Sequence, residues 1–146
     1  MISNSNNMKI TCKATTWKRS DQNNMDMVHL NIVDYTFGGY GLELGNTYLV
    51  MGVVSYKDSN TIYYLIDTYG KPYWFPSQLF EILDHSLPND WFINIYSGSE
   101  TSNVNSLLGF DELVRNEDFH DQLIERDEEV LRLYFKRKIE LEQSYK

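Results

Sequence analysis

The stretch from Tyr48 to Asp84 constrains the fold of this chain more than any other part of it. It holds three segments rich in β-branched and aromatic residues, YLVMGVVSY, TIYYLID and EILD, with a polar turn between the first two. Both alternating faces of TIYYLID are apolar, so we expect both faces of that strand to be covered. Pro72 and Pro76 cannot donate to a sheet ladder, which predicts that residues 73–75 lie on an edge or crossing strand. The stretch therefore predicts two hairpins followed by a short closing strand.

The segment FPSQLFEIL, residues 75–83, has a strand end at Pro-Ser, a short turn and a final strand. In this it resembles an SH3-like barrel, where a 3₁₀ turn after Pro-Ser leads into the strand that closes the barrel. The resemblance covers residues 48–84 and implies a small closed barrel. It also implies a groove for an extended peptide, with Pro76 and Phe80 at the matching positions and Trp74 beside them. Because large aromatic side chains usually serve burial, the alternative is that these residues belong to the core.

The segments before this stretch predict an added hairpin. Residues 1–7 are dominated by Ser and Asn, and we expect them to be a disordered tail. Alternating apolar residues predict strands at 8–18 and 26–35, and we expect these two strands to pair. The connection from Gly38 to Gly45 is rich in glycine but lacks a following Lys-Ser or Lys-Thr pair and a following helix. We interpret it as a turn rather than a phosphate cradle, and its use as a binding loop stays open.

The segments after this stretch predict a strand and a long helix. Residues 91–96 alternate in the manner of a strand, 97–105 read as a polar loop and 110–115 as one helical turn. Residues 116–143 carry apolar side chains at helical spacing, and Asn116 is a suitable N-cap. Whether this C-terminal helix serves the core or an interface is open at this stage.

Together these segments predict an α+β fold that is antiparallel and β-rich. We expect an SH3-like small barrel with an added N-terminal hairpin and a C-terminal helix. A chain of 146 residues fits one domain, and 42% hydrophobic residues can form a core. We therefore predict a single domain over residues 1–146, with a β-rich barrel region at 8–97.

Charge is unevenly distributed along the chain, which carries a net charge of −8. Residues 1–20 hold four bases and no acid, and residues 113–146 hold nine acids and seven bases. Residues 21–112 hold twelve acids and two bases, a balance of −10. An anionic surface repels nucleic acid and favours a basic partner. The alternative is that the charge serves solubility alone.

No motif in the sequence indicates a catalytic chemistry. The three histidines share no metal-ligand spacing, and no nucleophile elbow is present. Asp67, Asp84 and His85 are the acid–base residues that could converge, but capping of turns explains the two aspartates more simply. Cys12 is the only cysteine and sits in a strand pattern, so we interpret it as a small buried side chain rather than a nucleophile. We expect no enzyme activity, no metal and no cofactor.

The absence of an intrachain disulfide fits a reducing compartment. No apolar run approaches the ~20 residues that a membrane span requires, and the polar N-terminus is unlike a secretion signal. These features predict a cytoplasmic protein that binds neither membrane nor nucleic acid.

These properties favour a protein-binding module that sequesters a basic partner. Its sharpest form is an immunity protein, which covers the active site of a cognate bacterial toxin such as a cationic nuclease; the chain resembles such proteins in overall profile. The predicted charge contacts are Asp58, Asp67, Glu81, Asp84 and Asp90, and the predicted aromatic anchors are Tyr69, Tyr73 and Trp74. The alternatives are an adaptor or accessory subunit that binds an extended peptide, and an enzyme or small-ligand-binding protein with an unrecognised pocket.

Overall fold

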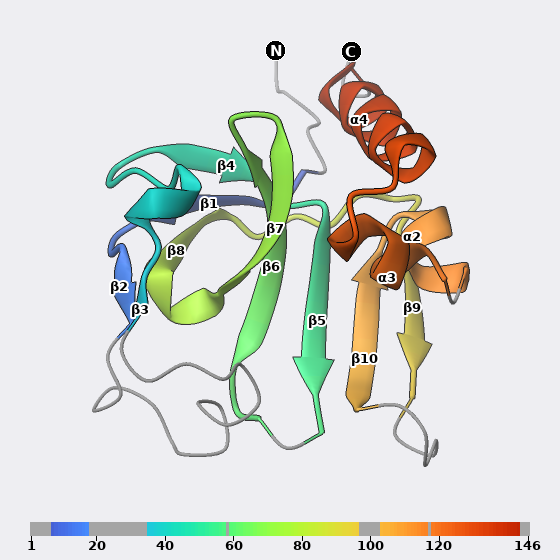
Figure 1. Ribbon diagram of the computed structural model, residues 1–146, viewed down its shortest axis with the longest axis horizontal. Coiled ribbons are helices and arrows are strands. Elements are labelled where there is room, and N and C mark those ends of the chain that lie inside the picture. The colour runs from blue at the N-terminus through green and yellow to red at the C-terminus, as the bar shows by residue number, and fades with distance from the viewer. Residues whose placement is uncertain (1–6, 18–34, 58, 97–102, 117, 144–146) are drawn as a thin grey trace.

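The computed structural model describes residues 7–17, 35–57, 59–96, 103–116 and 118–143 of the chain. These residues form antiparallel sheets followed by helices, which confirms the predicted α+β class (Figure 1). The polypeptide therefore combines antiparallel strand pairing with C-terminal helices, as the sequence predicts.

Two sheets contain most of the strands. The first sheet consists, in spatial order, of β4 (Thr47–Leu49), β1 (Lys9–Cys12) and β8 (Phe80–Asp84). The second consists of β7 (Lys71–Pro76), β6 (Ile62–Thr68), β5 (Gly52–Tyr56), β10 (Val104–Gly109) and β9 (Phe92–Ile95). A separate short pair joins β2 (Thr16–Trp17) to β3 (Tyr35–Thr36). The helices are η2 (Gly38–Tyr40), η3 (Ser77–Leu79), α2 (Asp111–Arg115), α3 (Phe119–Ile124) and α4 (Glu128–Gln143).

The hairpin of β6 and β7 confirms the central prediction. Tyr63 and Leu65 lie on one face of β6, and Tyr64 and Ile66 lie on the other. Each of these four side chains is at most 8% exposed, so both faces of β6 are covered. β7 lies at an edge of the second sheet, as its two prolines predict. The hairpin turns at Tyr69 and Gly70, whose φ angles of 52° and 76° match the right-handed twist of the paired strands.

The strand expected over residues 48–56 is divided between the two sheets. Val50 and Met51 separate β4 from β5, and both are fully buried. The Val50 amide donates to the Met8 carbonyl at 2.9 Å, whereas the Met51 amide donates to the Leu65 carbonyl at 2.8 Å. Two consecutive amides thus bond to different sheets, and the chain bends between them.

The predicted closed barrel is not present in the described residues. η3 links β7 to β8, which confirms the short turn after Pro76, and β8 pairs with β1. However, β7 and β8 lie at the edges of different sheets and do not pair with each other within the described ranges. The backbone turns through η3 instead of continuing a ladder, so the strands form two sheets.

The predicted N-terminal hairpin is observed where β2 pairs with β3, whereas β1 pairs with β4 and β8. β1 is the central strand of the first sheet, between β4 and β8, because Ile10 and Cys12 bury one of its faces in the core. Within the described residues the two predicted strands pair through β2 and β3, and most of the second strand, residues 26–34, lies outside those residues. Of the predicted tail, residues 1–6 also lie outside them, whereas Asn7 is 3% exposed and its Nδ2 donates to the Leu141 carbonyl at 3.1 Å.

The region after β9 departs from the prediction in two places. β10 occupies residues 104–109, where the polar loop was expected to extend to residue 105, and it pairs with both β5 and β9. α2 confirms the predicted helical turn. The long helix is divided into α3 and α4 by a turn in which Arg126 has a φ of 65°. Asp127 Oδ1 accepts from the Val130 amide at 3.1 Å and so caps α4, whereas Asn116 Oδ1 accepts from the Asp118 amide.

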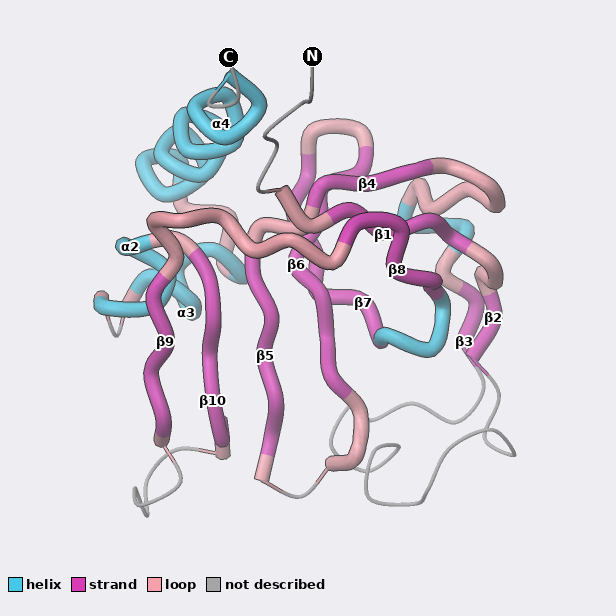
Figure 2. Tube along the Cα trace, turned by 180° about the vertical axis from the view of Figure 1, so that it is seen from behind, coloured by secondary structure: helices cyan, strands magenta, loops and turns pink. Residues whose placement is uncertain are grey.

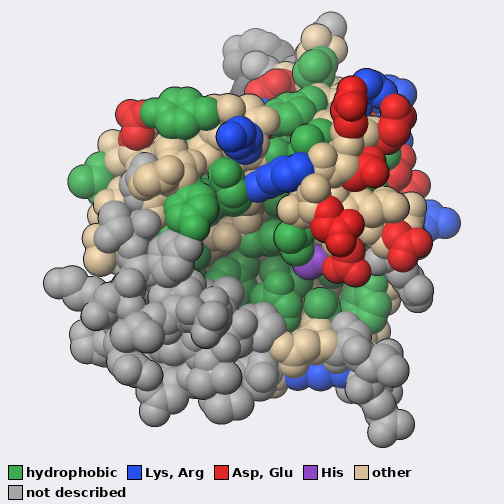
Figure 3. Space-filling model, in the orientation of Figure 1, with side chains coloured by type: hydrophobic (Ala, Val, Ile, Leu, Met, Phe, Trp, Pro, Cys, Tyr) green, Lys and Arg blue, Asp and Glu red, His purple; other side chains and the backbone are tan. Residues whose placement is uncertain are grey.

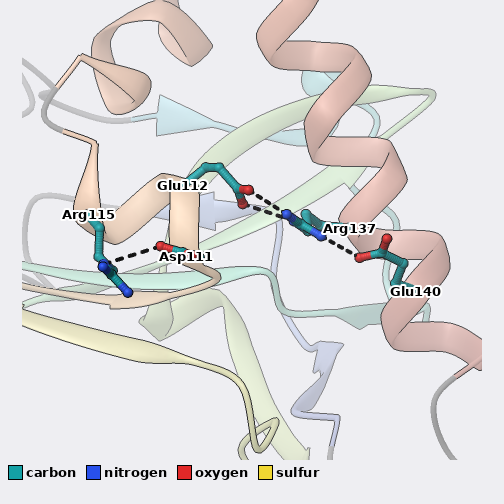
Figure 4. A network of polar contacts seen from close by, with 5 residues as sticks. All are labelled: Asp111, Glu112, Arg115, Arg137 and Glu140. Carbon is teal, nitrogen blue, oxygen red and sulfur yellow. Dashed lines mark hydrogen bonds and ion pairs between the residues drawn. The ribbon is translucent and has the colours of Figure 1, made fainter.

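Helices α2 and α3 pack over one end of the second sheet (Figure 1). In Figure 1, α2 and α3 lie over the end of the sheet formed by β10 and β9, and Figure 2 shows no described helix over the opposite face of that end. Val130, Tyr134 and Leu141 bury one side of α4 in the core. Arg137 of α4 also forms a bidentate ion pair with Glu112 of α2 (Figure 4). The C-terminal helix therefore serves the core.

Candidate partner-binding surface

A groove of about 210 Å³ lies between β7 and α3. Its sheet side is lined by Leu65, Pro72, Tyr73 and Trp74, and its helix side by Leu123, Ile124 and Arg126. Leu65 and Leu123 are at most 1% exposed and form the deep part of the groove. Ile124 is 54% exposed and stands at the rim. The groove is thus an apolar recess with an apolar side chain open to solvent.

A ring stack supports the wall of this groove. The rings of Trp74 and His120 are 5.4 Å apart with an angle of 28° between their planes. Burial lowers the pKa of His120, against the opposing effect of Asp121, whose Oδ1 is 3.6 Å from the histidine Nδ1. His120 is therefore neutral at pH 7. The Trp74 Nε1 and His120 Nε2 atoms are buried without a hydrogen-bond partner in the part of the chain that the structure describes.

Arg126 closes one end of the groove. Its guanidinium donates to the Pro72 carbonyl and lies over the Tyr73 ring, with Cζ 4.4 Å from the ring centroid. This contact fixes the turn between α3 and α4 against the edge strand β7. The division of the predicted long helix thus has a local consequence, because the turn places a cation and the side chain of Ile124 beside the sheet.

Exposed acidic residues precede and follow the groove residues Leu123, Ile124 and Arg126 along the chain. Residues 118–129 contain six acids and one base, a balance of −5, and each of the six acids is exposed. We call these six residues the acidic rim: Asp118, Asp121, Glu125, Asp127, Glu128 and Glu129. Figure 3 shows acidic side chains gathered over the helices beside hydrophobic side chains in the centre of the same face. Arg132 pairs with Glu128 and Glu129, but these pairs are exposed and contribute little to stability.

Of the predicted aromatic anchors, Tyr73 and Trp74 come together in the groove. Tyr69 lies apart from them, at the tip of the β6–β7 hairpin. It is 79% exposed, and its hydroxyl donates to Glu43 Oε2 at 2.8 Å. The pKa of the Tyr69 hydroxyl is raised, and the hydrogen bond to Glu43 is the largest cause. The groove therefore contains two of the three predicted aromatic residues.

The predicted charge contacts lie in different places. Asp67 has a side chain only 10% exposed and binds α4 from β6, so it has an internal role. Glu81 and Asp84 are on β8 in the first sheet, and Asp84 Oδ1 accepts from the Ser86 amide, which lowers the pKa of Asp84. Asp90 is exposed in the turn before β9, and Asp58 lies outside the described residues. Asp67 and Asp84 thus have separate hydrogen-bond partners, Asp67 on α4 and Asp84 in the turn that follows β8.

The peptide groove implied by the SH3-like resemblance is not formed at Pro76 and Phe80, because both side chains are buried. Pro76 is buried, and Phe80 is 6% exposed. The Phe80 ring packs at 5.9 to 6.4 Å against the rings of Tyr48, Tyr64 and Phe75. Both positions belong to the core, as the alternative interpretation predicted, because an aromatic cluster between the sheets covers them.

The residues predicted from the sequence as partner contacts include neither the acidic rim nor its apolar neighbours Leu123 and Ile124. The charge of the segments ERDEEV and KRK favours a solvated helix face over a binding patch. The signal that could have indicated a site is the interleaving of Leu123 and Ile124 with these acids. Cys12, by contrast, is as predicted: it is 2% exposed, and burial raises the pKa of its thiol.

The chain matches no protein-family model, no curated protein and no solved structure. Within the described ranges, no helix has the length and apolar character needed to cross a membrane. No group of three or more His, Cys, Asp and Glu side chains in those ranges is placed to hold a metal ion.

Proposed function

We propose that this protein is an acidic binding module that sequesters a basic protein partner. The observation that carries the proposal is the acidic rim beside the apolar groove between β7 and α3. Protein interfaces commonly combine an apolar centre with a polar border, and a field of one sign speeds the approach of a partner of the opposite sign. Both elements occur here on one face of the molecule.

Within this class, we propose an immunity protein that neutralises a cognate bacterial toxin. A toxin that acts on nucleic acid needs Lys and Arg around its active site, and an acidic module can cover that site by pairing with them. Neutralisation would follow from steric occlusion and would need no catalysis or cofactor. The net charge of −8 supports this choice of partner.

For the fold, we propose that the two sheets are an SH3-like arrangement extended by β10 and β9. The features that support this are the end of β7 at Pro76, the η3 turn after it, and the pairing of β8 with β1. In this arrangement the extension carries α2, and the acidic rim belongs to the added helices rather than to the barrel-like part.

The test is a pull-down from the native organism at low and high salt, with mass spectrometry of the retained protein. Two variants are compared with the wild type. One carries Asp118→Asn, Asp121→Asn and Glu125→Gln in the acidic rim. The matched control also loses three exposed acids, at Glu81, Asp90 and Glu142, by the corresponding amide substitutions.

We expect one basic protein to be retained at low salt, and the rim variant to retain about tenfold less of it. The control variant should bind like the wild type. A partner that is indifferent to salt and to the rim substitutions would contradict the proposal. A loss confined to the control variant would place the interface at the acids predicted from the sequence.

A further inference from the structure

We infer that the groove between β7 and α3 receives one apolar side chain from a basic segment of the partner. Lys or Arg side chains next to that anchor would pair with the acidic rim. This inference rests on the proposed function and adds to it the chemical class of the segment that is bound. The occupant is thus a cationic peptide segment with a single large apolar residue.

The size of the groove suits a single side chain. Its volume is about 210 Å³. A cavity of ~150 Å³ is enough to hold benzene, whereas pockets for whole small-molecule ligands occupy roughly 300–1,000 Å³. A Leu, Met or Phe side chain therefore fits the groove, and a complete cofactor does not.

The lining favours an apolar anchor over a polar one. Leu65, Leu123 and Ile124 supply aliphatic surface, and Trp74 supplies an aromatic wall. Ile124 is 54% exposed in the free protein, so an anchor placed against it would remove apolar surface from water on both partners. Such a central contact, bordered by residues that exclude water, is typical of binding hot spots.

Charge determines which residues can flank the anchor. Asp121 lies on α3 three positions before Ile124, Glu125 directly follows Ile124, and both are exposed, whereas the Arg126 guanidinium is held over Tyr73. Cations of the bound segment are therefore attracted towards α3 and repelled from the Arg126 end. A second copy of this chain fits less well, because its net charge of −8 opposes the acidic rim.

The experiment uses two fluorescein-labelled peptides of twelve residues built from Lys and Ala, one with Leu at the centre and one with Ala there. Binding to the full chain is measured by fluorescence anisotropy. Burying a Leu side chain contributes about 1.5–3 kcal/mol, so we expect the Leu peptide to bind roughly 10- to 100-fold more tightly. The same peptides are then tested against Ile124→Gln and Ile139→Gln. These two isoleucines are 54% and 53% exposed, and Ile139 lies on α4 and does not line the groove.

We expect Ile124→Gln to reduce the difference between the peptides at least threefold, and Ile139→Gln to preserve it. Equal binding of both peptides, with strong salt dependence, would overturn the groove inference and leave the acidic surface intact. No binding of either peptide would also overturn it, and the pull-down would then judge the proposed function separately. Retention of the full difference in Ile124→Gln would place the anchor outside this groove.

Discussion

Lys138 on α4 donates to Asp67 on β6, with Nζ and Oδ2 2.9 Å apart across 71 positions of sequence. The other oxygen of the same carboxylate accepts from the Tyr134 hydroxyl at 3.0 Å. Through these two bonds the Asp67 carboxylate attaches the C-terminal helix to the sheet. The Asp67 side chain is only 10% exposed, so water competes little with them. A residue that the sequence suggested as a partner contact thus holds the fold together.

Removal of this carboxylate is expected to destabilise the protein. Asp67→Ala leaves the buried Tyr134 hydroxyl and the partly buried Lys138 ammonium without their acceptor. We expect the free energy of unfolding to fall by about 2–4 kcal/mol, measured by urea denaturation. Asp90→Ala, which removes an exposed carboxylate, should change it by less than about 0.5 kcal/mol. Equal effects of the two substitutions would contradict the internal role of Asp67.

The close approach of α2 to the sheet depends on glycine. Gly109 of β10 pairs with Gly52 of β5, and a Cβ at Gly109 would lie 2.9 Å from the Met51 carbonyl oxygen and 2.8 Å from Leu113 Cδ2. Because the first of these is a backbone atom, Gly109→Ala should cost about 1–3 kcal/mol in thermal or urea unfolding. Gly39→Ala is the control, since a Cβ there meets nothing within 4 Å. A neutral Gly109→Ala would show that α2 can move away without cost.

Two arginine ion pairs of the C-terminal region should differ in their contribution to stability (Figure 4). Arg137 pairs with Glu112 across two helices at side-chain exposures of 31% and 25%, whereas Arg115 pairs with Asp111 within α2 at 62% and 50%. We expect Arg137→Met to lower the free energy of unfolding by about 1.5–3 kcal/mol. Arg115→Met should lower it by less than about 1 kcal/mol, because an exposed pair is screened by solvent. The reverse order would contradict the tie between α2 and α4.

Stability should depend on the protonation of His120. Burial lowers the pKa of this histidine below its ordinary value of 6.5, so the unfolded chain binds a proton at a higher pH than the folded one. The corresponding stability is present above pH 6.5 and is lost as pH falls through the lower pKa of the folded state. Urea unfolding at pH 7.5 and at successively lower pH should show this loss in the wild type. His120→Gln should flatten the dependence.

Local patterns predicted the elements that depend on nearby residues. The alternation in TIYYLID, the edge position of the proline-flanked strand and the turn after Pro76 all follow from side-chain period and backbone chemistry within a few residues. The same patterns could not identify β10, because VNSLLG does not alternate clearly and is stabilised by β5 and β9 on either side. They also could not locate the break at Arg126, whose partner Pro72 is 54 positions away.

The sequence by itself determined the antiparallel α+β character, the buried cysteine, the acidic charge and two aromatic residues of the candidate site, Tyr73 and Trp74. The tertiary structure alone decided that β1 lies between β4 and β8, that Asp67 faces α4 and that Leu123 and Ile124 line a groove with Tyr73 and Trp74. The physical reason is the range of the interactions. Strand and helix periods are set by adjacent residues, whereas burial and pairing depend on which distant segments come into contact.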